Sequence, residues 1–380
     1  MNSAEIISLY IHYPWCLRKC PYCDFNSYTL PKPEQELLNS YVDLLLVDLE
    51  LEADWTPSYR LSSIYFGGGT PSLLSPSEVK KIINRAQNLF SFVPDIEITL
   101  EANPGTIDLK LCKGFKDAGI NRISLGVQSF DDAKLKNIGR IHDAKQAREA
   151  VSAIKQAGFS NFNIDMMFGL PEQSVADAMH DLQVALDFAP PHFSWYQLTL
   201  EPNTIFAAKP PIVPQGEELW DIQQAGQELL AQSGLLQYEV SAYSKPGFEC
   251  RHNVNYWQYG DYLGIGAGAH GKITLANGVV KRYWKIANPK KYFQEQNAFI
   301  EGEKIVKCKQ RPFEFMLNAL RLYRPISYAL FRRRTGVTIS AIKKELQNAQ
   351  SLGLIELQSD AIITTPHGRN FLNDLLEIFL

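Results

Sequence analysis

Three cysteines lie within eight residues near the start of the sequence, at Cys16, Cys20 and Cys23. Thiolates this close in one loop can turn inward around a single inorganic centre. A structural zinc site usually closes its tetrahedron with a second cysteine pair, and the remaining three cysteines are isolated from one another. Three thiolates suit a [4Fe–4S] cluster that leaves one iron open to another ligand. The spacing therefore favours an iron–sulfur cluster over zinc.

Other polar residues follow apolar runs in the first half of the chain. They are Glu101, Gln128, Arg140 and Asp165. Each alone could be a surface or capping residue, but as a set on successive strands they are expected to line one ligand site. The run from Gly67 to Pro71 also follows a strand, and it could bring backbone amides to a ligand or simply form a turn.

The elements that position these residues alternate between two hydrophobic periods. The predicted strands are 6–11, 61–66, 95–100, 122–127, 161–167 and 193–200, and the predicted helices are 36–53, 76–86, 107–118, 144–157 and 176–186. Ser75 and Glu78 form a predicted capping box at the start of the second helix. Six alternating strands predict a parallel sheet with helices outside and an incomplete (β/α)6 barrel, because the alternation stops near residue 205.

The second half of the chain has a different pattern. A proline-rich linker at 202–215 precedes a helix at 217–233 and a stretch rich in aromatic residues and glycine. The last 70 or so residues predict three helices, a hairpin and a closing helix, which resemble a winged helix. We therefore predict a barrel domain at 1–205, an α+β segment at 206–305 and a winged-helix-like domain at 306–380.

Composition gives no general argument for a nucleic-acid or anionic membrane partner, because the 380 residues carry a net charge of −3. We expect neither a signal peptide nor a membrane span, and the cysteines do not form a disulfide framework. These features predict a cytoplasmic protein, although peripheral membrane contact stays open. The basic run at 332–334 is read as a solvated helix face.

The Cys-x3-Cys-x2-Cys spacing, with Tyr22 before the last cysteine, resembles the radical S-adenosylmethionine (SAM) superfamily. The resemblance implies that the open iron binds the amino and carboxylate groups of SAM, and that an electron from the cluster cleaves SAM to a 5′-deoxyadenosyl radical. The Gly67–Pro71 run lies where the superfamily binds the methionine amino group. The predicted (β/α)6 alternation agrees with the fold of the superfamily.

Longer stretches resemble the oxygen-independent coproporphyrinogen III oxidase family, from about residue 5 to the C-terminus. They are Tyr10–Cys16, Phe66–Ser72, Glu101–Pro104, Ser124–Ser129 and Phe168–Pro171. The resemblance implies SAM contacts at Tyr10, Tyr22, Gly68, Gly69, Thr70, Glu101, Gln128, Arg140 and Asp165. Carboxylates suit ribose hydroxyls and the sulfonium group, and an arginine suits the SAM carboxylate.

Two departures from the oxidases narrow the resemblance. Phe25 stands where the oxidases have a further cysteine, and the cysteine loop begins by residue 16, whereas the oxidases carry a longer N-terminal arm. Both departures resemble the sister branch of HemW-type heme chaperones, as does the HNxxYW motif from His252 to Trp257. This branch implies a protein that binds the cluster, SAM and heme and hands heme to acceptor hemoproteins without oxidase activity.

The motif makes His252 the predicted axial ligand of heme iron, although a histidine beside aromatic residues is more often part of a core. Cys250 is an alternative thiolate ligand, whereas His12 and His270 are expected to serve structure or the mouth of the site. The predicted partners are heme and acceptor hemoproteins, and a homodimer stays open. The alternative function is a radical coproporphyrinogen III oxidase, and a third is a zinc-binding regulator with a DNA-binding tail.

Overall fold

A computed structural model describes residues 6–32, 34–56, 59–295 and 298–380 of the chain. Its main sheet has six parallel strands at the centre, in the order β1-β4-β5-β6-β7-β8. Their bounds are β1 (Ile6–Tyr13), β4 (Arg60–Gly68), β5 (Ser91–Ala102), β6 (Arg122–Gln128), β7 (Phe162–Phe168) and β8 (His192–Gln197). The six predicted strands are therefore confirmed. Because they are parallel, their carboxyl ends meet at one mouth.

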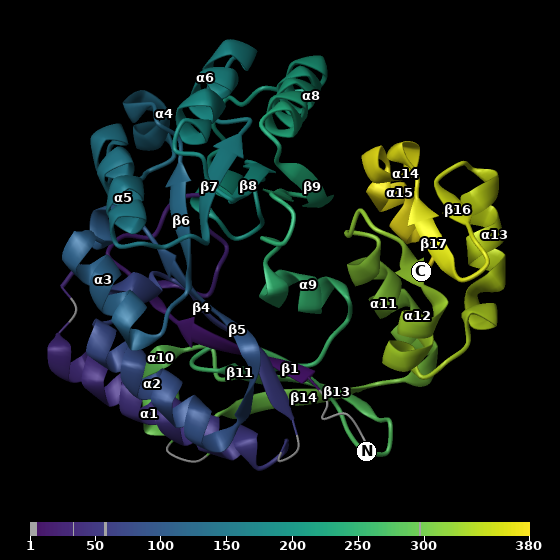
Figure 1. The fold of residues 1–380 in the computed structure, drawn as a ribbon, viewed down its shortest axis with the longest axis horizontal. Coiled ribbons are helices and arrows are strands. Elements are labelled where there is room, and N and C mark those ends of the chain that lie inside the picture. The colour runs from purple at the N-terminus through teal and green to yellow at the C-terminus, as the bar shows by residue number, and fades with distance from the viewer. Residues whose placement is uncertain (1–5, 33, 57–58, 296–297) are drawn as a thin grey trace.

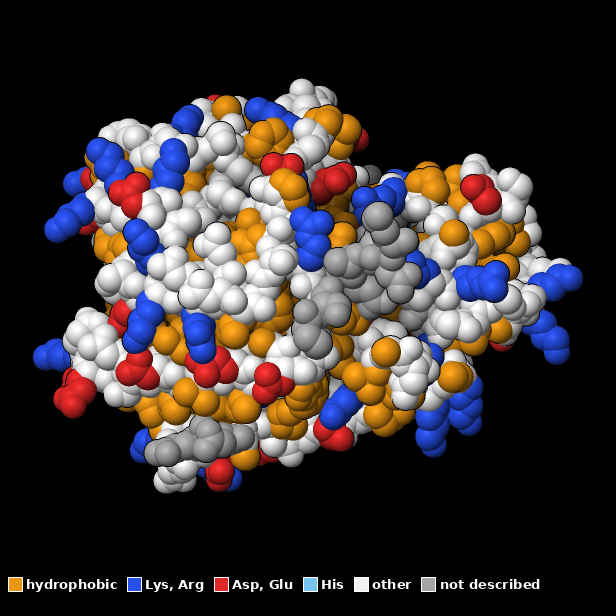
Figure 2. All heavy atoms as spheres, turned by 60° about the horizontal axis from the view of Figure 1, so that its bottom comes forward, with side chains coloured by type: hydrophobic (Ala, Val, Ile, Leu, Met, Phe, Trp, Pro, Cys, Tyr) orange, Lys and Arg blue, Asp and Glu red, His pale blue; other side chains and the backbone are white. Residues whose placement is uncertain are grey.

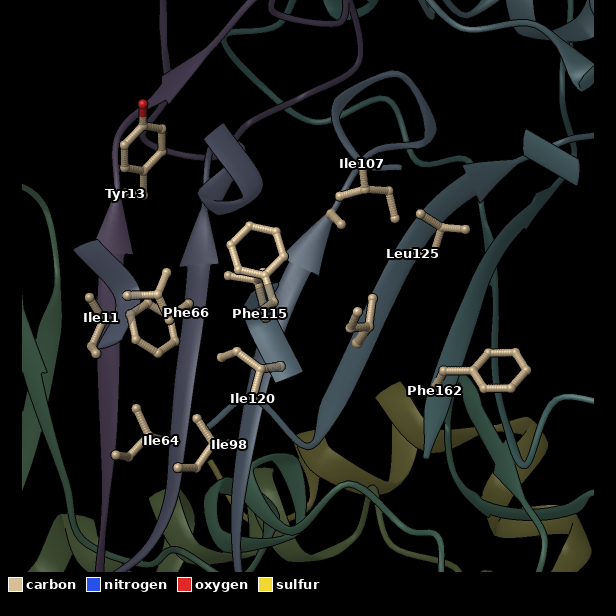
Figure 3. Close-up of a cluster of buried hydrophobic side chains, with 14 of the residues drawn as sticks. Ile11, Tyr13, Ile64, Phe66, Ile98, Ile107, Phe115, Ile120, Leu125 and Phe162 are labelled. Carbon is tan, nitrogen blue, oxygen red and sulfur yellow. The ribbon is translucent and has the colours of Figure 1, made fainter. Parts of the chain in front are cut away.

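Helices cover the outer face of these strands, as Figure 1 shows on the left and at the top. They are α1 (Gln35–Ala53), α2 (Pro76–Leu89), α3 (Leu109–Ala118), α4 (Asp132–Asn137), α5 (Ala144–Gln156), α6 (Val175–Leu186) and α8 (Glu217–Gln232). The core lies between helices and strands, where Ile64, Phe66 and Phe115 are completely buried. Figure 3 shows such side chains projecting from neighbouring strands toward the helices. Alternate residues of each strand face the opposite way, into the barrel.

The start of α2 has the predicted capping box. The Ser75 hydroxyl accepts a hydrogen bond from the Glu78 amide at 3.3 Å, and the Glu78 carboxylate accepts one from the Ser75 amide at 2.6 Å. Helix α3 ends at Gly119, whose φ of 110° is readily adopted by glycine. Local sequence therefore determined where both helices begin or end.

Residues beyond 205 extend the same sheet at both edges, which the sequence pattern did not predict. On the β1 side lie β11 (Tyr262–Ile265), β12 (His270–Thr274), β13 (Val280–Lys285) and β14 (Ile300–Val306), and on the β8 side lie β10 (Ala242–Ser244) and β9 (Leu236–Glu239). Strand β11 runs parallel to β1, and the next three are antiparallel. Three of these strands have only three or four residues, too few for a clear period of two.

Short helices complete this part of the chain: α7 (Ile205–Ala208) within the predicted linker, α9 (Arg251–Trp257) and α10 (Pro289–Gln294). Helix α9 packs against β4 and also contacts α11 of the last domain. Figure 1 shows α9 between the barrel and that domain. The HNxxYW motif is therefore carried by an element that touches both parts of the molecule.

The last residues form the predicted winged-helix-like unit with a three-stranded sheet. Its elements are α11 (Arg311–Ala319), β15 (Ile326–Ser327), α12 (Tyr328–Thr335), α13 (Lys343–Ser351), β16 (Ile355–Leu357), β17 (Ala361–Thr364), α14 (Pro366–Asn370) and α15 (Leu372–Glu377). Its hydrophobic core includes Phe315, Phe331 and Ile362, and Tyr259 from outside the unit joins it. The division into three domains stays a prediction, since the sheet runs through residues of the first two.

The surface in Figure 2 carries charges of both signs on the barrel, whereas Lys and Arg predominate on the end formed by the last domain. Arg332 and Arg333 on α12 and Lys343 and Lys344 on α13 are exposed. None of the described helices is both long and apolar enough to cross a membrane.

Candidate cluster and cofactor site

The cysteine loop is tied down at both ends. Strand β1 leads into β2 (Trp15–Cys16), which pairs with β3 (Tyr28–Thr29), so the loop at 17–27 begins and ends at neighbouring strands. Inside the loop the Cys23 amide donates to the Cys20 carbonyl at 3.1 Å. The Lys19 ammonium donates to the carbonyls of Phe25 at 2.8 Å and Ser27 at 3.1 Å. The sequence between the strands is thereby folded into a compact turn.

The three thiols of the loop are free and half-buried. Burial raises the pKa of Cys16, the neighbouring thiols Cys20 and Cys23 raise it further, and the Thr70 hydroxyl lowers it. Burial also raises the pKa of Cys23. Because neighbouring thiols affect the pKa of Cys16, the three side chains lie in one locality, and burial favours the thiol form of Cys16 and Cys23 in the absence of a cationic centre. Among the described residues, no three His, Cys, Asp or Glu side chains are spaced for a single metal ion.

The glycine run packs directly onto this loop. The Gly69 amide donates to the Tyr13 carbonyl at 2.6 Å, and the Thr70 amide donates to the Trp15 carbonyl at 2.8 Å. A Cβ atom on Gly69 would lie 2.4 Å from the Trp15 carbonyl oxygen. Glycine is therefore required for the close approach of two backbones. The sequence had suggested amides offered to a ligand, but these amides are already used within the protein.

Gly68 has the same packing role toward β1 and β5. A Cβ atom there would lie 2.6 Å from the His12 ring, and the φ of Gly68 is 110°. Its amide donates to the Glu101 carboxylate at 3.2 Å, and the Tyr65 hydroxyl donates to the same carboxylate at 2.8 Å. Burial raises the pKa of Glu101 to about 7. This carboxyl group is therefore half-protonated near neutral pH and poised to respond to a cationic ligand.

Asp165 and Gln128 lie on the inner side of the neighbouring strands. Asn163 donates to the Asp165 carboxylate at 2.7 Å and Ser124 donates at 3.1 Å, while burial raises the pKa of Asp165. Gln128 has a φ of 73°, a left-handed conformation that is uncommon outside glycine, and accepts a hydrogen bond from Tyr196 at 2.7 Å. The strained turn at the end of β6 directs this side chain to the mouth.

Arg140 connects the cysteine loop to the strand ends. One guanidinium nitrogen donates to the Cys20 sulfur at 3.7 Å, and another donates to the Asn103 side chain at 2.7 Å and to the Gly126 carbonyl. Its Nε is buried without a partner. Asn103 in turn donates to the Thr70 hydroxyl at 3.0 Å. A half-buried, incompletely paired guanidinium next to a cysteine fits a carboxylate ligand beside a cluster.

Two of the residues in this network were not singled out from the sequence. Asn103 lies in the Glu101–Pro104 stretch, so its place after a strand was a usable signal. Tyr65 lies on β4 beside Tyr10 of β1, and their rings are 6.3 Å apart. Tyr10 pairs with the His12 ring at 3.0 Å. Tyr65 was missed because it lies within the predicted strand 61–66, and a hydrophobic strand pattern does not show which of its side chains face the polar interior of the barrel.

Tyr22, the aromatic residue before the last cysteine, packs against a segment beyond the central strands. Its ring lies 6.4 Å from that of Phe206 on α7. Burial raises the pKa of Tyr22, while the charge of Arg140 lowers it. The Phe206 amide donates to the Pro21 carbonyl at 3.0 Å. A piece of the predicted linker thus supports the cysteine loop.

The structure places His252 away from the cysteine loop, in the barrel interior. Its Nδ1 hydrogen bonds with the Ser63 hydroxyl at 3.0 Å and its Nε2 with the Tyr256 hydroxyl at 2.9 Å. The side chain is 1% exposed and stacks on Tyr65 with ring centroids 4.9 Å apart, and burial lowers its pKa to about 3. In this arrangement neither ring nitrogen is open to an iron, so ligation by His252 requires a neighbour to move.

The other candidate heme ligands differ in exposure. The Cys250 thiol is buried 3.6 Å from the Glu97 carboxylate, and burial raises its pKa to about 12, which opposes a thiolate there. His12 is buried and its Nε2 hydrogen bonds with the Asn26 carbonyl at 2.9 Å, which agrees with the expected structural role. His270 is exposed at the start of β12.

Comparisons with known proteins agree with this geometry. Residues 10–185 match the Radical SAM superfamily, and residues 307–371 match the HemN C-terminal domain. Coproporphyrinogen III oxidase (HemN) from Escherichia coli has the same fold, with a TM-score of 0.82 at 22% identity over 99% of this chain and 90% of that one.

Closer relatives match along the whole chain. Heme chaperone HemW from Haemophilus influenzae is 46% identical over 100% of this chain and 99% of its own. Heme chaperone HemW from Escherichia coli is 44% identical over 100% of both chains. The Bacillus subtilis heme chaperone HemW is 32% identical over 98% of this chain and 99% of its own. At this identity and coverage, the chain belongs to the HemW family of heme chaperones, within the radical SAM superfamily.

Proposed function

We propose that this protein is a heme chaperone that binds a [4Fe–4S] cluster, SAM and heme and transfers the heme to acceptor hemoproteins. The observation that carries the proposal is the full-length identity of 46% to a relative named heme chaperone. The exposed Phe25 supports it within the site, because its position in the cysteine loop offers no fourth thiol. We place the protein in the cytoplasm, in keeping with its free cysteines.

The cluster ligands in this proposal are Cys16, Cys20 and Cys23. The cluster would supply an electron source and an open iron, and the Arg140–Cys20 contact gives the sulfur environment a fixed positive charge. SAM would contact the residues that the family resemblance names for this role. They are Tyr10, Tyr22, Gly68, Gly69, Thr70, Glu101, Gln128, Arg140 and Asp165. We propose that these cofactors gate heme transfer or dimerisation and do not drive a catalytic turnover.

The cluster assignment predicts a selective effect of cysteine substitution. Wild-type protein reconstituted without oxygen should be brown with broad visible absorbance, and Cys20→Ser should lose most of this absorbance and its bound iron. Cys112→Ser is the matched control, because Cys112 is buried within α3 and away from the loop. Equal iron content in both variants, or a colourless zinc-containing wild type, would contradict the assignment.

The function is tested by two assays on one anaerobic preparation. We expect stoichiometric heme uptake and transfer to an apo-hemoprotein, measured by the Soret band, with no loss of coproporphyrinogen. Coproporphyrinogen consumption with release of carbon dioxide would instead establish the oxidase function that the HemN-like fold allows. Absence of heme uptake by the cluster-loaded wild type would contradict the chaperone proposal.

The ligand role proposed for His252 needs a control for packing. His252→Ala should weaken heme uptake and change the Soret and electron paramagnetic resonance spectra if the imidazole binds iron. Ser63→Ala removes a hydrogen bond to the same ring and retains the imidazole. Identical heme spectra in both variants would show that His252 only packs in the barrel interior and that another group ligates iron.

A further inference from the structure

Asn103 lies at the centre of a chain of side chains that starts and ends at the cysteine loop. It directly follows β5, and its amide group contacts Thr70 on one side and Arg140 on the other. These three residues and Cys20 line one small hollow beside the loop. Asn103 is therefore placed between two side chains that themselves reach toward cysteines.

The backbone of Asn103 is fixed by its own neighbours in the sequence. Pro104 restricts the residue before it to extended backbone, and Asn103 has a φ of −108° and a ψ of 146°. The Thr106 hydroxyl accepts from the Asn103 amide at 3.3 Å and donates to the Asn103 carbonyl at 2.8 Å. The same hydroxyl lies 2.6 Å from that of Ser72, next to the glycine run. The side chain of Asn103 thus projects from a backbone that is already held in place.

The amide group of Asn103 can have only one orientation. Its Oδ1 accepts from the Arg140 guanidinium at 2.7 Å, and a guanidinium group can donate but cannot accept. The amide nitrogen must therefore face the other way, where it donates to the Thr70 hydroxyl at 3.0 Å. Arg140 thereby determines which atom of Asn103 meets Thr70.

This orientation determines the direction of the Thr70 hydroxyl hydrogen. Because the Thr70 oxygen accepts from Asn103, its single hydrogen is left to donate elsewhere. The Thr70 amide donates to the Trp15 carbonyl at 2.8 Å, which holds Thr70 beside Cys16. Burial raises the pKa of Cys16, and a side-chain hydrogen bond with Thr70 lowers it. Asn103 therefore directs the Thr70 hydrogen toward the Cys16 sulfur.

The other arm of the chain holds a positive charge beside Cys20. The Nη1 atom of Arg140 donates to the Cys20 sulfur at 3.7 Å, while Nη2 donates to Asn103 and to the Gly126 carbonyl. A Cβ atom on Gly126 would lie 3.0 Å from Nη2, so the guanidinium fits closely against β6. Asn103 provides one of the two acceptors that keep the guanidinium in this position.

We propose that Asn103 is a positioning residue that sets the reduction potential of the cluster, by aligning one hydrogen-bond donor toward Cys16 and another toward Cys20. The inference rests on the cluster assignment in the proposed function. Donors and positive charge beside the ligating sulfurs stabilise the reduced cluster, which carries one more negative charge than the oxidised form. The side chain of Asn103 therefore raises the potential through its two neighbours.

The test measures the midpoint potential of full-length, anaerobically reconstituted protein in the absence of SAM. Asn103→Ala should favour the oxidised cluster by about tenfold, a fall of about 59 mV for one electron, followed by electron paramagnetic resonance of the reduced cluster. Asn121→Ala is the matched control, because Asn121 also hydrogen bonds with β5, at the Ile98 amide and the Ile96 carbonyl, further from the carboxyl end of the strand. The control should keep the wild-type potential.

A second variant, Asn103→Asp, retains the shape of the side chain and covers the case in which Asn103→Ala holds no cluster. A carboxylate only accepts hydrogen bonds, so Thr70 should donate to it and withdraw its hydrogen from Cys16. The potential should fall, and it should fall less when Thr70→Val has already removed the hydroxyl. The difference separates the hydrogen bond from the added charge, which acts in both backgrounds.

The outcomes separate this role from the cluster assignment. A wild-type potential in a cluster-loaded Asn103 variant, or an equal fall with and without the Thr70 hydroxyl, would overturn the role of Asn103 and leave the cluster in place. A wild-type protein that takes up no cluster under the same conditions would overturn the cluster assignment as well.

Discussion

The carboxyl group of Glu101 shows how the fold sets the chemistry of a single residue. It lies half-buried at the end of β5, where it accepts hydrogen bonds from Tyr65 and Gly68. Burial raises its pKa to about 7, so between its ordinary pKa and about 7 the folded protein holds a proton that the unfolded chain has released. This group therefore lowers the stability of the fold as pH rises through that window.

A cationic ligand should favour the ionised form of Glu101 over the protonated form. The sulfonium of SAM favours the ionised carboxylate, so binding should release a proton near pH 6.5, and affinity should rise between roughly pH 5.5 and 7.5. Calorimetry in buffers with different ionisation enthalpies measures the proton. Glu101→Gln should abolish the release, and S-adenosylhomocysteine, which lacks the sulfonium charge, should reduce it. Proton release that persists in Glu101→Gln would refute the assignment.

At the scale of elements, a buried ion cluster joins α1 to β13. The Lys285 ammonium pairs with Asp48 at 2.6 Å and with Glu52 at 2.5 Å, and all three side chains are at least 98% buried. Asp48 also accepts from the Gly266 amide at 3.0 Å. The same turn is held by Asn26, which donates to the Ala267 and Ala287 carbonyls at 3.0 Å each. The buried ion cluster and Asn26 of the cysteine loop therefore hold the same turn at Gly266 and Ala267.

Removal of the cation should leave two buried carboxylates uncompensated. Lys285→Met should lower the free energy of unfolding by about 3–5 kcal/mol, measured by urea denaturation at neutral pH. Lys281→Met on the same strand breaks a pair whose carboxylate is 55% exposed and should cost less than about 1 kcal/mol. Equal decreases in the free energy of unfolding of the two variants would show that the buried ion pairs do not hold α1 to the sheet.

At the scale of the whole molecule, the barrel and the last domain each have a hydrophobic core. Ile64 belongs to the core of the barrel, and Phe331 belongs to the core of the last domain. Tyr259 reaches from the barrel side into the second core and donates to Glu314 at 2.8 Å. Because each part has a hydrophobic core of its own, we expect the two parts to unfold separately.

Scanning calorimetry should then resolve two transitions. Phe331→Ala should lower the melting temperature of one transition and Ile64→Ala that of the other, since each truncation of a buried side chain costs about 2–5 kcal/mol. Each variant is the control for the other. A single transition shifted by both variants would show that the last domain is not an independent folding unit.

The sequence by itself determined the six central strands, their helices and the cysteine loop, because hydrophobic periods, caps and ligand spacing are local properties of the chain. It also placed Glu101, Gln128 and Asp165 at one mouth, since parallel strands end on the same side. It did not reveal the strands from β9 to β14, several of which are short, nor that β11 and β10 join this part of the chain to β1 and β8, which are far away in sequence. A pairing of Tyr10 with Gly264 becomes visible only when the chain closes.

Only the tertiary structure decided what surrounds each functional side chain. The sequence made His252 the candidate axial ligand of heme iron, whereas folding buries it between Ser63 and Tyr256. It suggested free amides in the glycine run, whereas the close approach of Gly69 to Trp15 uses them. The physical reason is the same in both cases: burial and hydrogen-bond partners come from contacts between distant segments, which no local pattern of residues encodes.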